Sequence, residues 1–202
     1  MTEARSTRDA LHSSTREALL DAAYDVIVAG NWQKARMVDV ASAAGVSRQT
    51  LYNEFGSKDA VAQALAERES QRFIDGTNRF IDEVHPDRPV DAIAAATEWT
   101  IREASDNPLL KAVLTDDTHD LLPFLTTRGE VVIGAARRNI ESYWLSHWPE
   151  LPREDVELVS EMVARLTISY LVLPSDGPDG SAEAIAERMA QLVERLLMKG
   201  VS

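Results

Sequence analysis

Apolar residues recur along the 202-residue chain at the three- and four-residue spacing of amphipathic helices, and no alternating run of strand length stands between turn residues. Ser14 and Glu17 form a capping-box pattern, which predicts a first helix that begins there and ends near Gly30. The two most regular apolar stripes predict helices over 154–173 and 181–198. The pattern therefore predicts an all-α protein.

Three further helices are predicted between these regions, and proline marks the end of each. One begins at Ser57 and runs towards Val84, where a His-Pro pair follows. A second covers the stripe at 90–104, before an Asn-Pro pair. A third covers 132–144 and ends before Pro149.

Two short amphipathic stretches flank a glycine within residues 37–55. Gly45 suits the left-handed position just past a helix end, where a side chain would be strained. Ser47 is a suitable N-cap for the second stretch, whose core side carries Leu51 and Phe55. Two short helices joined by a tight glycine turn predict a helix-turn-helix, a motif that enters the major groove of DNA.

The outer side of the second short helix carries side chains suited to DNA. Arginine pairs with guanine and glutamine with adenine, so Arg48 and Gln49 are candidate base readers, and Thr50 suits a thymine methyl group. Tyr52 has the length to give its hydroxyl to a phosphate. Lys58 stands beside the N-terminus of the next helix, a position that favours a phosphate contact.

Charge is distributed unevenly along the chain, which has a formal net charge of −12. Residues 1–58 contain seven basic and seven acidic side chains, so residues 59–202 carry the whole excess. An acidic body is repelled by DNA, and only the neutral N-terminal part is therefore suited to bind it. The same distribution also fits an acidic protein with a neutral end and no nucleic-acid partner.

At these residues the sequence resembles the TetR family of one-component repressors. The likeness extends over roughly residues 14–65 and is carried by Gly45-Val46-Ser47, Leu51-Tyr52, Phe55 and Lys58. It implies phosphate contacts for Ser47, Tyr52 and Lys58. It implies base-facing roles for Arg48, Gln49, Thr50 and Asn53.

Two positions depart from the family pattern. Met37 stands where the family often has a threonine that binds phosphate, so we expect that contact to be missing or taken over by Arg36. Glu54 stands where a basic or neutral residue is common. Close to DNA its carboxylate would be repelled by phosphate or would accept from a cytosine amino group.

With this resemblance we expect an Ω-shaped homodimer that binds double-stranded DNA. Residues 1–13 are expected to be a flexible N-terminal arm and 14–57 the helix-turn-helix DNA-binding domain. Residues 58–202 are expected to form the ligand-binding and dimerisation domain. The last two helices are expected to build a four-helix bundle with those of a second copy.

Large apolar side chains in the C-terminal part are candidates for lining an effector cavity, although such residues more often belong to the core. They are Trp99, Phe124, Tyr143, Trp144, Met162, Leu166 and Tyr170. They favour a small hydrophobic effector, for example an acyl chain or another lipid-like compound. We therefore expect a repressor that such an effector releases from its operator. The alternatives are an activator, a global regulator with many sites, and an all-α enzyme or ligand carrier that uses the motif as scaffold.

Other kinds of site have little support in the sequence. The chain has no cysteine, no P-loop, no glycine-rich dinucleotide turn and no hydrolase motif, so we expect neither catalysis nor a cofactor. Residues 116–120 gather carboxylates with His119, but acidic runs before a proline are usually loops or helix caps, and we expect no metal there. A polar start and the lack of an apolar run of about 18 residues predict a cytoplasmic protein with no membrane partner.

Overall fold

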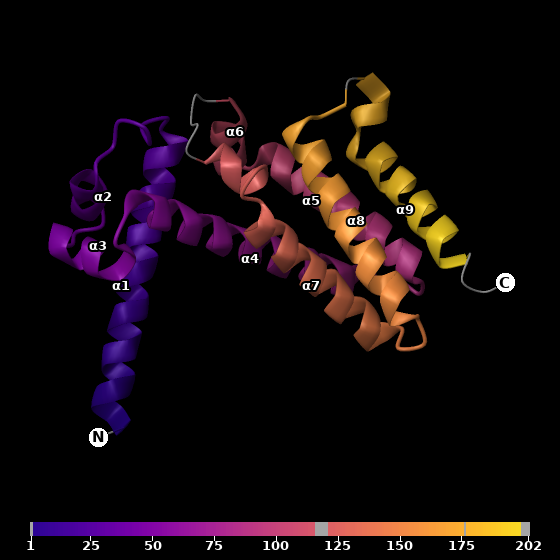
Figure 1. Cartoon of the computed structure of the whole chain (residues 1–202), viewed down its shortest axis with the longest axis horizontal. Helices are drawn as coiled ribbons and strands as arrows, with labels where there is room; N and C mark the ends of the chain where they lie inside the picture. Colours follow the sequence, from indigo (N-terminus) through magenta and orange to yellow (C-terminus); the bar gives the residue numbers. More distant parts are fainter. Residues whose placement is uncertain (1, 116–120, 176, 199–202) are drawn as a thin grey trace. The chain divides into compact units, whose positions relative to one another are not determined.

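The computed structural model describes residues 2–115, 121–175 and 177–198, and over these ranges it contains α-helices and two short 3-10 turns but no strand (Figure 1). The predicted all-α class is confirmed. The helices form two compact units. The first comprises the chain up to Glu67 together with Pro108–Pro123, and the second comprises Arg68–Asn107 together with the chain from Phe124 onwards.

The first unit is built on the N-terminal helices. Its elements are α1 (Thr2–Val28), α2 (Met37–Ala43), α3 (Arg48–Phe55), the beginning of α4 (Lys58–Val84) and α6 (Pro108–Thr115). α2 packs against both α1 and α3. The core residues include Leu20, Ala23 and Ile27 of α1, which the helical spacing predicted for one face and which are all buried.

The start of α1 differs from the prediction. The capping box at Ser14 is not a helix start, because the helix continues back to Thr2 and includes the stretch expected to be a flexible arm. Residues 2–13 contain neither glycine nor proline, so nothing in the backbone stops the helix once the segment from Leu19 onwards packs in the core.

α6 was not predicted as a helix, and it lies in the first unit although the expected domain boundary falls after residue 57. Pro108 opens this helix, since proline is tolerated at the first helical position, where its missing N–H has no partner to lose. In the predicted pattern the same proline only ends the preceding helix. α6 packs against α1.

The second unit contains the four other long helices and the rest of α4. The four helices are α5 (Pro89–Asp106), α7 (Glu130–His147), α8 (Arg153–Val172) and α9 (Ala182–Met198). The 3-10 turn η2 (Gly177–Gly180) also belongs to this unit, whereas η1 (Leu122–Leu125) has residues in both units. α5 packs along α9 and α7 along α8, and α5 also contacts α8 (Figure 1). The predicted long helices are confirmed, with ends that shift by a few residues.

The apolar stripe of α9 is used inside the chain. Its buried residues Met189 and Val193 share a core cluster with Ile93 of α5. Ion pairs join the same two regions at both ends, one between Arg102 and Glu183 and another between Arg88 and Glu194. A dimer through the last two helices therefore has to use other residues of α9 than this stripe.

Candidate nucleic-acid interface

The turn between α2 and α3 has the hydrogen bonds of a Schellman motif. The N–H of Val46 donates to the carbonyl of Ala41 at 2.9 Å, and the N–H of Gly45 donates to the carbonyl of Ser42 at 3.1 Å. Gly45 has a φ of 68°, in the left-handed region that glycine adopts without strain. The predicted glycine turn is confirmed, and it satisfies the carbonyls at the end of α2.

Ser47 caps the first turn of α3. Its Oγ accepts a hydrogen bond from the N–H of Thr50 at 3.0 Å and lies 2.8 Å from the Oγ1 of the same residue. This confirms the predicted N-cap. The Thr50 side chain is half-buried and held by the cap, so its methyl group has a fixed orientation at the start of α3.

α3 has an inner and an outer side. Leu51 is fully buried, whereas Arg48, Gln49, Tyr52 and Asn53 are exposed. The outer side is ordered by two contacts between residues four apart, which are neighbours on a helix surface. The Arg48 guanidinium lies 5.1 Å from the centroid of the Tyr52 ring, and the Gln49 Nε2 donates to the Asn53 Oδ1 at 2.8 Å.

Glu54 does not belong to the outer side. Its carboxylate lies 3.0 Å from Nη1 of Arg16 on α1, and only 7% of the side chain is exposed. The carboxylate is therefore directed to α1 and does not stand among the exposed side chains that are the candidates for DNA contact. Its pairing with Arg16 directs the Glu54 carboxylate to the side of α3 that faces α1.

At the start of α2, Met37 occupies the position where the family often has a threonine that binds phosphate. Met37 is buried, and the Asp39 carboxylate accepts from the backbone N–H of Arg36 at 2.7 Å. This hydrogen bond, followed by that from the Arg36 guanidinium, holds the pKa of the Asp39 carboxyl below its usual value. The Arg36 side chain is 79% exposed, so it remains accessible to a phosphate, and that role stays a prediction.

Lys58 has partners inside the first unit. Its Nζ donates to the carbonyl of Trp32 and to that of Gln33 at 3.3 Å, and it lies 4.8 Å from the centroid of the Trp32 ring. An ammonium group has three N–H donors, so these two carbonyls leave one for a phosphate oxygen. The predicted phosphate contact remains a prediction. Lys58 is the first residue of α4, and Ser57 caps this helix by accepting a hydrogen bond at its Oγ from the N–H of Ala60 at 3.1 Å.

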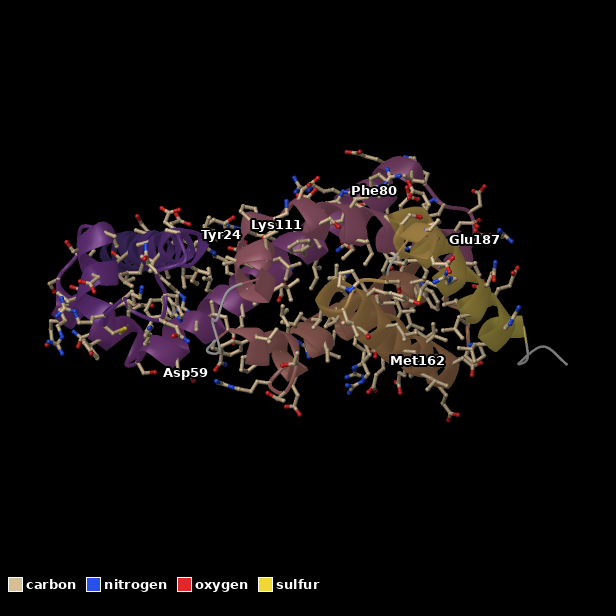
Figure 2. The ribbon with its side chains drawn as sticks, turned by 90° about the horizontal axis from the view of Figure 1, so that it is seen from above. Tyr24, Asp59, Phe80, Lys111, Met162 and Glu187 are labelled. Atoms are coloured by element: carbon tan, nitrogen blue, oxygen red, sulfur yellow. The ribbon has the colours of Figure 1, made fainter. Side chains whose placement is uncertain are left out.

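Five of the candidate effector residues lie on α7 and α8. Trp144 is buried in the core of the second unit, and Tyr143, Leu166 and Tyr170 pack around that core. Met162, labelled in Figure 2, is half-buried on α8. Trp144 serves packing in this structure, and the partly buried side chains around it are the better candidates for contact with an effector.

Trp99 belongs to a separate aromatic group. Its ring centroid lies 6.3 Å from that of Phe73 and 6.5 Å from that of Phe80 (labelled in Figure 2), both on α4. The indole lies directly against Gly76, where an added Cβ would be 2.3 Å from a ring carbon. Phe124 is buried in η1, apart from this group in the sequence.

A polar bridge that the sequence did not predict joins α4 and α7. Asn78 and Asn139 exchange two amide hydrogen bonds of 3.0 and 2.9 Å, although 61 positions separate them. One helical turn further along, burial and the charge of Asp82 raise the pKa of Tyr143 above its ordinary value. No local pattern marks such a pair, because it depends on how two distant helices meet.

Metal ligands and membrane-spanning helices were sought in the described ranges of the chain. No group of three potential metal ligands occurs there, and the predicted loop or cap at 116–120 lies outside the described residues. None of the helices in those ranges combines the length and apolar character needed to cross a bilayer.

Two family models match the chain. The one described as bacterial regulatory proteins of the tetR family matches residues 19–65, and the one described as the bacterial tetracycline repressor C-terminal domain matches residues 89–193. The first covers the helix-turn-helix built around Gly45, and the second covers most of the second unit.

Relatives and solved structures agree with these matches. The HTH-type transcriptional regulator AlkX of Mycobacterium tuberculosis is 29% identical over 188 residues, which are 93% of this chain and 89% of that protein. The crystal structure of the TetR family repressor AlkX from a Dietzia species, implicated in biodegradation of n-alkanes, is 30% identical and has a TM-score of 0.72 over 90% of this chain and 96% of that chain. The R. erythropolis repressor QsdR shares the fold at 16% identity, with a TM-score of 0.64 over 91% and 94% of the two chains. The chain therefore belongs to the TetR family of transcriptional regulators, with a helix-turn-helix DNA-binding domain followed by a helical C-terminal domain.

Proposed function

We propose that the protein is a ligand-responsive repressor that binds a pseudo-palindromic operator as a dimer and is released by a small hydrophobic effector. The observation that carries the DNA-binding part is the outer side of α3, where Arg48, Gln49 and Tyr52 face solvent while Leu51 anchors the helix. The Schellman turn and the Ser47 cap fix both ends of the connection to α2.

The contacts on α3 suggest how its side chains read bases. With its Nε2 bound to Asn53, Gln49 retains its Oε1 as an acceptor, and Asn53 retains its Nδ2 as a donor. An acceptor beside a donor matches the N6 amino group and N7 of adenine. Arg48 suits guanine, and Tyr52, against which the Arg48 guanidinium lies, suits a phosphate.

Selection of DNA duplexes from a random pool tests this part directly. The wild-type chain should enrich one inverted-repeat sequence, measured afterwards by gel shift. Tyr52→Phe should weaken binding to all duplexes, and Arg48→Ala should relax the preference at one base pair per half-site, by about 1–3 kcal/mol. Arg79→Ala removes a charge from an exposed position of α4 and is the control. If the wild-type chain enriches no sequence, the DNA-binding part of the proposal is refuted.

Dimerisation through the last two helices is tested at Leu158, an exposed residue of α8. Leu158 is 55% exposed although the opposite side of α8 is fully packed. Leu158 lies on one of the two helices proposed to meet a second copy, so a charge added there tests that interface. Leu158→Glu should convert a dimer into a monomer in sedimentation experiments, whereas Val84→Glu, at an exposed position on α4, should not. A wild-type chain that sediments as a monomer at micromolar concentration would contradict this part.

The effector is proposed to be apolar on two grounds. Candidate residues on α7 and α8 are aromatic or aliphatic, and a repressor 30% identical to this chain is implicated in biodegradation of n-alkanes. A hundredfold loss of operator affinity needs about 2.7 kcal/mol of differential binding. Burying about 110 Å² of apolar surface is worth that much.

A series of straight-chain fatty acids and alcohols tests the effector class. Members of optimal chain length should release a fluorescent operator duplex from the protein, while shorter ones should not. Release by no member of the series, together with intact operator binding, would refute the apolar effector and leave the DNA-binding part standing. A reporter gene under the selected operator distinguishes repression from activation.

A further inference from the structure

An ion pair joins the inner side of α3 to α1 in the first unit. Nη1 of Arg16 lies 3.0 Å from Oε1 of Glu54, with 38% and 7% of the two side chains exposed. The same guanidinium lies 4.7 Å from the centroid of the Phe55 ring. One arginine therefore contacts two consecutive residues at the C-terminal end of α3.

The ion pair and the apolar packing of α3 differ in what they fix. Leu51 is fully buried, and apolar packing of this kind holds α3 down but is not directional. A charge-assisted hydrogen bond depends on distance and angle, so the Glu54 carboxylate restricts rotation of α3 about its own axis. Rotation decides which side chains face outwards, because successive residues on a helix are separated by about 100°.

We propose that Arg16 and Glu54 are positioning residues for DNA recognition, which hold the rotation of α3 so that Arg48 and Gln49 present their side chains to the bases. The proposal rests on the DNA-binding part of the proposed function. Glu54 acts through Arg16 and does not touch DNA. It therefore raises affinity for the correct operator without changing the attraction between the protein and phosphate.

The direction in which one substitution changes DNA affinity distinguishes this role from that of a carboxylate close to DNA. If Glu54 faced the phosphates, neutralising it would strengthen binding to any duplex, because repulsion would be lost. If Glu54 positions α3, Glu54→Gln weakens binding to the operator alone. The charge on the protein changes identically in both cases, so only the geometry decides the outcome.

The experiment compares variants on two duplexes, the sequence selected by the wild-type chain and a scrambled sequence of equal composition. Glu54→Gln and Arg16→Met should each bind the selected duplex about tenfold more weakly, while Glu54→Gln keeps wild-type affinity for the scrambled one. Arg16→Met and Glu54→Gln combined should be no weaker than Arg16→Met alone, since the two residues act as one unit. Glu67→Gln, which neutralises an exposed carboxylate of α4 in the same unit, should leave the operator preference unchanged.

Several results would overturn the positioning role. They are unchanged or stronger binding of Glu54→Gln to the selected duplex, an equal loss on both duplexes, and additive losses in the double variant. Thermal unfolding is measured for every variant. If Arg16→Met fails to fold, Glu54→Asp decides instead, because the retained charge should restore part of the preference lost in Glu54→Gln. A wild-type chain that selects no duplex would instead refute the proposed function itself.

Discussion

Replacing Gly45 by alanine tests whether the turn between α2 and α3 has to be left-handed. The residue has a φ of 68°, and a Cβ added there meets no atom within 4 Å. Collision with the rest of the chain therefore contributes nothing, and only the strain of an L-residue in this region remains, about 1–2 kcal/mol. Alanine also restricts the unfolded chain, which offsets about 0.4–1 kcal/mol.

The expected net loss is about 1 kcal/mol of unfolding free energy, which lowers the Tm by about 2–4 °C for a chain of this size. Operator affinity should fall by about tenfold, because relaxing the strain at residue 45 turns α3 away from its position. Gly45→Asn should have smaller effects, since asparagine tolerates the left-handed region better than alanine. Thermal unfolding and gel shifts on the selected duplex measure the two effects separately.

Gly177→Ala is the matched control. Gly177 has a φ of 71°, and a Cβ added there also meets no atom within 4 Å, but the residue lies in η2 of the second unit. Both alanine variants should lose similar stability, and only the Gly45 variant should lose operator affinity. The reasoning is refuted if Gly45→Ala is more stable than wild type or binds the operator as tightly as Gly177→Ala does.

Three further predictions concern the second unit. Gly76→Ala should lower the Tm despite the better helix propensity of alanine, worth about 1 kcal/mol, because its Cβ would collide with Trp99; a higher Tm would contradict the packing. Asn139→Ala should destabilise the fold by about 1–3 kcal/mol by leaving the Asn78 amide unpaired. Adding Asn78→Ala should cost little more, and additive losses in unfolding experiments would refute the pairing. The raised pKa of Tyr143 should contribute stability below about pH 10 that is lost as pH rises further. Absorbance titration should show one phenolate that forms at higher pH than the others and is missing in Tyr143→Phe. If Tyr143→Phe instead removes a phenolate that forms at lower pH, burial of Tyr143 is refuted.

Local backbone chemistry explains why the helix-turn-helix was predictable. The left-handed Gly45 and the Ser47 cap are short-range features, so a few consecutive residues suffice to recognise them. The inner position of Leu51 follows from helical spacing in the same way. The start of α1 was missed because a capping-box pattern inside a continuing helix has the same sequence as one at its start.

Partners distant in the sequence account for the other differences. The inner position of the Glu54 carboxylate depends on Arg16, which lies 38 positions away on another helix. Lys58 likewise binds carbonyls 26 and 25 positions earlier in the chain. Such pairings are properties of tertiary packing, which no local pattern specifies.

The separation of α3 into an inner and an outer side also bears on how such a regulator evolves. Substitutions at Gln49 or Asn53 alter groups that contact each other and solvent, so they change the fold's stability little. The anchors Leu51 and Glu54 are untouched by such changes. Under the proposed function, single substitutions on the outer side of α3 therefore change the preferred DNA sequence while the stability of the fold stays nearly the same.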